Sequence, residues 1–129
     1  IPRVLNFKTY DDMFTTDVTF EQIAHAIYDL DTAGWAEPYE TLKARVWSGF
    51  EDIAHQCEKQ GGGNVLVVSH GLTIGFLLNL IDAKQPVRAG LLNGSVTKVT
   101  YEDGTFSIAG INDVHYIEQG KTHTKESFL

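Results

Sequence analysis

Residues 64–80, NVLVVSHGLTIGFLLNL, decide how the rest of this chain is organised. Four consecutive apolar residues, 65–68, end abruptly at a triplet of small and polar residues that contains His70. A short β-branched run of this kind indicates a buried strand. The apolar segment 72–81 is too long for a second strand and follows a glycine, so it indicates a helix. His70 is therefore expected at the carboxyl end of a strand and beside the N-terminus of a helix.

That position favours a functional role for His70. Open α/β sheets bind ligands at the carboxyl ends of their strands. Helix N-termini present free N–H groups and a partial positive charge, which suit an anion such as phosphate. Ser69 and Gly71 are small residues at a point where a buried strand would otherwise continue with apolar ones. A cleft-facing histidine does acid–base or nucleophilic work near neutral pH, although a lone histidine is more often a packed or capping residue.

The composition is that of one acidic globular domain. The chain has 129 residues, of which 43% are hydrophobic and 21% charged, with a formal net charge of -7. It has no basic cluster, so nucleic acid and anionic membranes are not expected partners. No apolar run approaches the roughly 20 residues that a membrane helix needs. Cys57 is the only cysteine, which excludes a disulfide within the chain and fits a reducing cytoplasm.

Two helices are predicted before the 64–80 stretch. Thr19 is a plausible N-cap, and apolar residues share one face of the segment that it opens, 19–30. The apolar spacing of residues 39–60 predicts a second helix, which three consecutive glycines end. Helical elements therefore lead into the apolar stretch.

A hairpin is predicted after the 64–80 stretch. Residues 95–101 and 105–111 are expected to pair as strands around a turn at 102–104, which contains Asp-Gly. From Gly120 the chain is polar, and a loose tail is expected there. The order helix, helix, strand, helix, hairpin predicts a layered α/β or α+β domain.

Several stretches together resemble the histidine phosphatase superfamily, also called the phosphoglycerate mutase-like family. Residues 65–71, VLVVSHG, followed by an apolar helix, resemble the family's second histidine motif. Residues 36–46, AEPYETLKARV, resemble its glycine-glutamate-serine stretch, with Glu37 in the place of the glutamate and Arg45 in that of the arginine. Further similar segments occur in the family's order at 6–12, 93–99 and 112–115.

The resemblance implies an α/β fold of the phosphoglycerate mutase-like type, a three-layer sandwich with helices on both faces of a mainly parallel sheet. Residues 1–119 would form the C-terminal part of a single domain, and 120–129 a polar tail. The family's first strand, with its Arg-His-Gly triplet, has no counterpart in these 129 residues. We therefore expect a fold that is incomplete in this chain, which is inactive alone and is completed by the missing N-terminal segment or by a second copy of the chain.

For the intact protein the resemblance implies phosphomonoester hydrolysis through a phosphohistidine. His70 would bind the transferring phosphoryl group together with the N–H groups of Gly71 and Leu72. Glu37 would orient a histidine or shuttle a proton, or it simply opens the following helix. The expected ligand is a small phosphorylated metabolite or inorganic phosphate, and no metal or other cofactor is implied. Leu72 stands where the family's mutases carry Asn, which favours a phosphatase.

Two other interpretations stay open. A catalytically inactive or regulatory phosphate-binding member of the same family would explain the missing triplet. A serine hydrolase would use Ser69 as its nucleophile, with Asp103 and His115 completing a triad in the right order. Val67, however, stands where the nucleophile elbow of such an enzyme needs a small residue.

Overall fold

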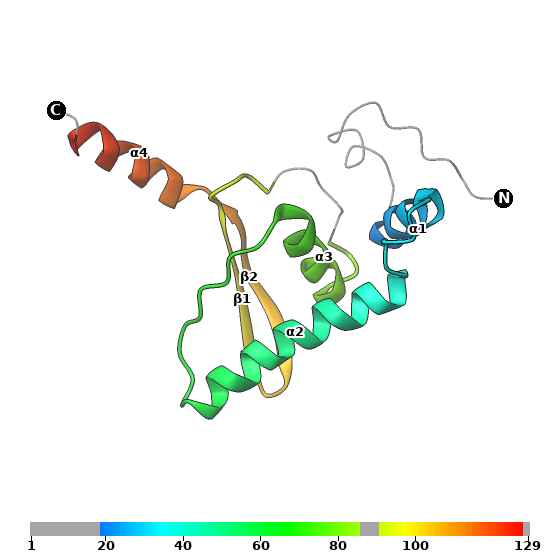
Figure 1. Ribbon diagram of the computed structural model, residues 1–129. Helices are drawn as coiled ribbons and strands as arrows, with labels where there is room; N and C mark the ends of the chain where they lie inside the picture. The colour runs from blue at the N-terminus through cyan, green and yellow to red at the C-terminus, as the bar shows by residue number, and fades with distance from the viewer. Residues whose placement is uncertain (1–18, 86–90, 128–129) are drawn as a thin grey trace.

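The computed structural model describes residues 19–85 and 91–127 (Figure 1). Its elements are α1 (Phe20–Leu30), α2 (Tyr39–Lys59), α3 (Gly71–Ile81), β1 (Val96–Glu102), β2 (Thr105–Asp113) and α4 (His115–Ser127). This mixture of helices and strands is compatible with an α/β fold. Within the described ranges the sheet is a single antiparallel pair, β1–β2, so a mainly parallel sheet in three layers is not confirmed. The family-like loop expected at 6–12 lies outside the described residues.

Helix α1 begins at a complete capping box, as the sequence predicts. The N–H of Gln22 donates to Oγ1 of Thr19 at 3.1 Å, and the N–H of Thr19 donates to Oε1 of Gln22 at 3.1 Å. Two of the N–H groups that a helix leaves without an internal partner are thereby satisfied. Phe20 and Ile23 form the buried face of the helix.

Helix α2 confirms the second predicted helix. It ends at Lys59, and the N–H of its C-cap residue, Gln60, donates to the carbonyl of Cys57 at 3.1 Å. Gly61, Gly62 and Gly63 follow with φ values of +97°, +84° and +130°. Residues other than glycine rarely adopt such backbone conformations. The glycine triplet therefore ends the helix and redirects the chain toward the segment that precedes α3.

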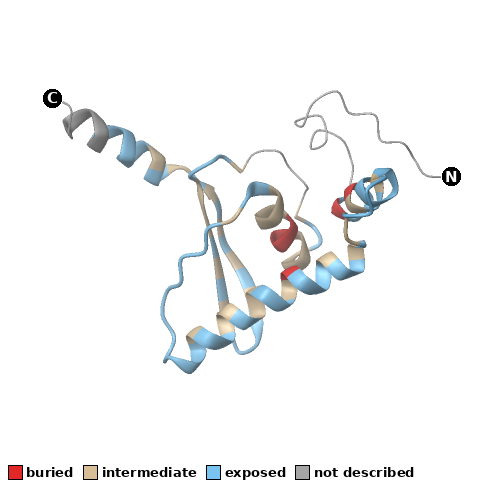
Figure 2. Ribbon diagram, viewed as in Figure 1, coloured by how far each residue is buried: buried red, intermediate tan, exposed pale blue. Residues whose placement is uncertain are grey.

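The core lies where α1, α2 and α3 meet (Figure 2). Phe20, Val46 and Phe76 are its buried members. The rings of Phe20 and Phe76 are tilted, with centroids 5.6 Å apart, and Tyr39 contacts Phe76 edge-on at 5.9 Å. Gly75 permits the approach of α1 to α3, because a Cβ at this position would lie 3.1 Å from Cζ of Phe20.

The turn between β1 and β2 has the geometry that its sequence predicts. Asp103 and Gly104 both have positive φ, 52° and 78°. Two-residue hairpin turns of this hand match the twist of the flanking strands, and Asp-Gly is a preferred sequence for them. The predicted hairpin is thus confirmed.

Aromatic side chains hold the hairpin against α2. Phe106 of β2 faces Tyr101 across the hairpin, with ring centroids 4.6 Å apart. Trp47 of α2 contacts Phe106 edge-on at 5.2 Å, and the Nε2 of His55 lies 2.9 Å from the hydroxyl of Tyr101. One face of α2 therefore packs against the strands.

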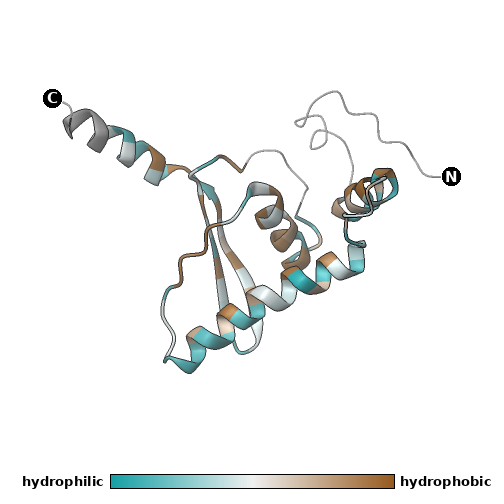
Figure 3. Ribbon diagram, in the orientation of Figure 1, coloured by the Kyte–Doolittle hydropathy of each residue, from teal (hydrophilic) through white to brown (hydrophobic). Residues whose placement is uncertain are grey.

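The prediction of a buried strand at residues 65–68 is wrong for the described structure. The segment between the glycine triplet and α3 is neither helix nor strand, and its apolar side chains are exposed (Figures 2 and 3). A strand requires a neighbour to pair with its backbone, and within residues 19–85 and 91–127 none pairs with this segment. The sequence pattern is that of a strand, but the pairing is lacking.

The loose tail expected from Gly120 is also wrong, because α4 continues to Ser127. The helix begins where the N–H of His115 donates to Oδ1 of Asp113 at 2.9 Å. Within it, Nζ of Lys121 lies 3.7 Å from Oε1 of Glu118, one turn away. Polar side chains at such spacings support an exposed helix without a buried face.

Candidate functional site

The candidate site begins at His70, which is the N-cap residue of α3. Its backbone is extended, with φ -107° and ψ 153°, and its carbonyl accepts the N–H of Ile74 at 3.0 Å. The imidazole makes no capping hydrogen bond, and the residue is exposed. His70 thus occupies the position that the sequence predicts, with a side chain that the helix does not use.

The backbone of the first turn of α3 adds hydrogen-bond donors beside His70. The N–H groups of Gly71 and Leu72 belong to the first turn, where a helix offers no internal acceptor, and the helix dipole makes this end partially positive. Gly71 is in van der Waals reach of Leu91, whose carbonyl oxygen lies 3.5 Å from where a Cβ would stand. An imidazole and two amide groups at one helix end form an arrangement suited to a phosphate-sized anion.

Glu37 lies just before α2 and is bound by Arg45. The Nε of Arg45 lies 3.1 Å from each carboxylate oxygen of Glu37, and an Nη atom lies 2.5 Å from Oε1. The hydrogen bonds from Arg45, and to a lesser degree its charge, lower the pKa of Glu37, while partial burial opposes this effect. Glu37 is therefore an oriented carboxylate that stays ionised near neutral pH.

Glu37 and His70 are not brought together by the described residues. The beginning of α2 and the beginning of α3 lie well apart in Figure 1, and the hydrogen bonds of Glu37 go to Arg45. The structure thus places the N-terminus of α3 at one point and an oriented carboxylate at another.

The serine-hydrolase interpretation is contradicted by the positions of its three residues. Asp103 is in the turn before β2, and His115 follows the other end of that strand. The nine residues of β2 span roughly 30 Å at the usual rise per residue. Asp103 therefore cannot orient His115, so these two residues do not form the expected triad with Ser69.

Sequence reasoning placed Glu37 and Arg45 but did not foresee their contact. Their separation of eight residues includes the entry into α2, so helical periodicity does not bring them together. The loop before α2 supplies the missing geometry, because Asp31 accepts the N–H groups of Ala33, Trp35 and Ala36 at 3.0, 2.6 and 2.6 Å. An aspartate at the start of a glycine-containing loop is the signal that could have indicated this turn.

These features place an exposed histidine at the N-terminus of a helix, an arrangement suited to an anion such as a phosphoryl group. The family model of the histidine phosphatase superfamily (branch 1) matches residues 7–114. The match covers well over half of the chain, which therefore belongs to the histidine phosphatase superfamily. No curated protein and no solved structure matches the chain.

Two further features are absent from the described residues. Within 19–85 and 91–127, no group of three or more His, Cys, Asp or Glu side chains is arranged to hold a metal ion. In the same part of the chain, no helix is long and apolar enough to cross a membrane. Family membership indicates a phosphatase-type activity.

Proposed function

We propose that this chain supplies the second histidine of a phosphatase that hydrolyses phosphomonoesters through a phosphohistidine. The observation that carries the proposal is His70, an N-cap residue whose imidazole is exposed and makes no capping bond. The imidazole of an N-cap residue that makes no capping hydrogen bond is available to bind a ligand. The superfamily match supplies the class of reaction.

In this proposal His70 donates a hydrogen bond to a non-bridging phosphoryl oxygen, and the N–H groups of Gly71 and Leu72 donate to the others. A nucleophilic histidine from outside the 129 residues forms the P–N bond while the P–O bond to the leaving alcohol breaks. Water then breaks the P–N bond and releases inorganic phosphate. The donors stabilise the negative charge of the transferring group, the main need of phosphoryl transfer.

Glu37 is proposed as the supporting carboxylate, which orients a histidine or accepts a proton. Its ion pair with Arg45 keeps it ionised, so it suits acceptance better than donation of a proton. The proposal requires that the completed domain bring the start of α2 toward His70. In that completed domain, we place the described elements in a three-layer sandwich with a mainly parallel sheet. We propose that the completed protein acts on a small phosphorylated metabolite in the cytoplasm.

A second candidate is a catalytically inactive, regulatory phosphate-binding member of the same superfamily. It is favoured by Val4 and Lys8, which stand where the family resemblance leads us to expect an acidic residue and a loop glycine. The helix end at His70 would then bind phosphate, and no phosphohistidine would form. Both candidates predict anion binding at α3, and they differ only in turnover.

Binding is tested by titrating the chain with inorganic phosphate while following its amide NMR signals. We expect the signals of Gly71 and Leu72 to shift most, and the shifts to be lost in His70→Ala. His115→Ala serves as the matched control, because His115 also begins an exposed helix, α4, and its loss should leave the shifts unchanged. If phosphate leaves the Gly71 and Leu72 signals unmoved, the proposed site is wrong.

Turnover separates the two candidates. p-Nitrophenyl phosphate is offered to the chain alone and to the full-length protein, and acid-labile phosphate on histidine is assayed by mass spectrometry. A phosphatase predicts no turnover by the chain alone, turnover by the full-length protein and a phosphohistidine outside residues 1–129. Phosphate binding without any phosphohistidine in the full-length protein would instead establish the regulatory candidate.

A further inference from the structure

The sequence contains one asparagine that is followed directly by glycine, the pair Asn93-Gly94. The backbone nitrogen that follows an asparagine can attack the carbonyl carbon of the asparagine side chain, which makes asparagine a chemically labile residue. Glycine has no Cβ, so it hinders this attack less than any other residue in the following position. The pair is therefore reactive wherever the fold leaves it accessible.

The fold places this pair in an exposed turn just before β1. The N–H of Ser95 donates to the carbonyl of Leu92 at 3.0 Å and closes the turn. Gly94 has a φ of +82°, whereas Asn93 is not among the residues with positive φ, which is the pattern of a type II turn. Both residues of the pair are exposed. Solvent therefore reaches the two groups that have to react.

The reacting groups of the pair are not held by other residues. Within residues 19–85 and 91–127, neither the carboxamide of Asn93 nor the N–H of Gly94 makes a hydrogen bond. The turn precedes the first residue of β1, Val96, so the backbone of Asn93 can rotate without breaking a strand pair or a helix. The nitrogen of Gly94 can thus approach the side-chain carbonyl carbon of Asn93.

Two other asparagines of the described residues are held in place by hydrogen bonds. The Oδ1 of Asn112 accepts the N–H of Leu92 at 2.9 Å, and its own N–H donates to Oγ1 of Thr97 at 3.2 Å. Asn79 lies within α3, and its Nδ2 donates to the carbonyl of Gln85 at 3.1 Å. Attack on either side chain first requires these bonds to open.

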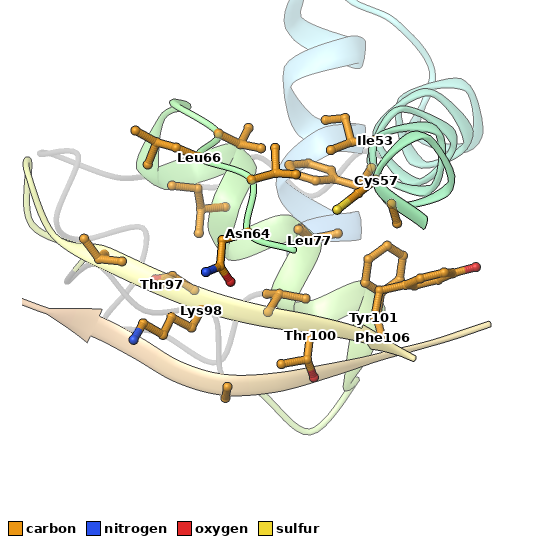
Figure 4. A pocket seen from close by; sticks show the side chains of 18 of the residues that line it. Ile53, Cys57, Asn64, Leu66, Leu77, Thr97, Lys98, Thr100, Tyr101 and Phe106 are labelled. Carbon is orange, nitrogen blue, oxygen red and sulfur yellow. The ribbon is translucent and has the colours of Figure 1, made fainter. Parts of the chain in front are cut away.

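Asn64 provides a comparison that isolates the effect of the following residue. It lies in the extended segment before α3, where it lines a largely apolar cavity beside β1 (Figure 4). It is exposed, and its side chain makes no hydrogen bond within residues 19–85 and 91–127. The next residue is Val65, whose branched Cβ hinders the attacking nitrogen. Asn93 alone combines exposure, free reacting groups and a following glycine among the described asparagines.

We propose that Asn93 is a site of spontaneous deamidation, with water as the only co-reactant. The nitrogen of Gly94 loses its proton to solvent and bonds to Cγ of Asn93, while the C–N bond of the carboxamide breaks and its nitrogen leaves as ammonia. Water then opens the resulting succinimide ring. Breaking the new bond between the nitrogen and Cγ gives an aspartate at position 93, and breaking the original peptide bond gives an isoaspartate.

The modification alters a turn that contacts two helices. The carbonyl oxygen of Leu91 lies 3.5 Å from where a Cβ of Gly71 would stand, and a Cβ of Gly94 would lie 3.2 Å from Cγ1 of Ile117 in α4. Either product adds a negative charge to a chain whose net charge is -7. Isoaspartate also inserts a methylene group into the main chain, which displaces the contacts on one side of the turn relative to the other. This chemistry is independent of the phosphatase proposed above.

Peptide mass spectrometry of the incubated chain provides the first test. The peptide with Asn93 should gain the mass difference between a carboxyl and a carboxamide group, and main-chain fragmentation should identify isoaspartate. Asn79 should react at least about tenfold more slowly, because α3 must first open locally. The reaction at Asn93 should be faster in mildly alkaline than in mildly acidic buffer, because the attacking nitrogen must lose its proton. Asn93→Gln is the matched control and should stay unmodified, since its longer side chain would have to close a six-membered ring.

Amide hydrogen exchange then measures the effect on the turn. The N–H of Ser95 should exchange at least about tenfold faster in the isoaspartate form, in which the bond to Leu92 is displaced. Freshly prepared Asn93→Asp carries the added charge on an unchanged main chain, so its Ser95 amide should exchange as in the original protein. Modification of Asn93 no faster than that of Asn64 overturns the proposal. A product without isoaspartate, or an isoaspartate form with unchanged exchange at Ser95, overturns it as well.

Discussion

Arg45 donates hydrogen bonds to both carboxylate oxygens of Glu37, from a position one and a half turns into α2. The residue that the family resemblance marks for chemistry is thus held by a second residue of the same motif. The pair joins the loop before α2 to the body of that helix. A bidentate contact fixes direction as well as charge, which a single ammonium could not do.

Removing Arg45 should raise the pKa of Glu37. Because the pKa in the folded chain is lowered from its ordinary value of 4.5, the pair stabilises the fold above that pH, and this contribution is lost as the pH falls through the folded-state pKa. The pair is partly exposed, so its contribution is about 0.5 kcal/mol. An NMR titration of the Glu37 carboxyl should give a higher pKa in Arg45→Gln and an intermediate value in Arg45→Lys. Identical titrations in all three proteins would show that the contact does not form in solution.

Replacing His70 with serine should stabilise the chain. His70 makes no side-chain capping bond, whereas a serine at the N-cap position accepts an N–H of the first turn and contributes about 1 kcal/mol. Urea denaturation should show a higher midpoint for His70→Ser and little change for His70→Ala. Equal midpoints for the serine and alanine variants would mean that the start of α3 is not capped as described.

Gly75→Ala should destabilise the core although alanine favours helices. The added Cβ would lie 3.1 Å from Cζ of Phe20, a buried ring already packed on Phe76, so overpacking should cost about 1 kcal/mol or more. Gly49→Ala is the matched control, because nothing lies within 4 Å of the new Cβ, and it should stabilise α2 by about 0.5–1 kcal/mol. Urea denaturation compares the two. A stabilising Gly75→Ala would contradict the packing of α1 on α3.

Loss of the capping box should weaken α1. Thr19→Ala removes the acceptor for the N–H of Gln22 and should cost about 1 kcal/mol in the free energy of unfolding. Thr19→Ser retains the hydroxyl and should be nearly neutral. Amide exchange in the first turn of α1 should accelerate in the alanine variant alone, and acceleration in both variants would argue against the cap.

The local elements were predictable because their determinants lie within a few residues of each other. Thr19 with Gln22 specifies the start of α1, and Asp103-Gly104 specifies the turn of the hairpin. Residues 65–68 were mispredicted because a strand is defined by a distant neighbour, which a local pattern does not supply. The polar α4 was missed because it has no apolar stripe to reveal it.

The candidate site also has one part that local sequence determines and another that depends on distant contacts. The position of His70 at the head of α3 follows from an adjacent strand-like run and helix, so the sequence alone located it. The contact of Arg45 with Glu37 depends on how the loop after Asp31 folds back, and periodicity carries no information about that. The relation between Glu37 and His70 depends on strands beyond the described pair.

The uncharged character of residues 64–69 has a consequence for how the protein behaves at high concentration. A six-residue segment of high β-propensity, without charge or proline, has the composition of a steric zipper, the unit that stacks in amyloid fibrils. Charged or proline residues that usually interrupt such stacking are absent from Gln60 to Ile81. The repulsion of the negative charges carried elsewhere in the chain, whose net charge is -7, is therefore what opposes such stacking.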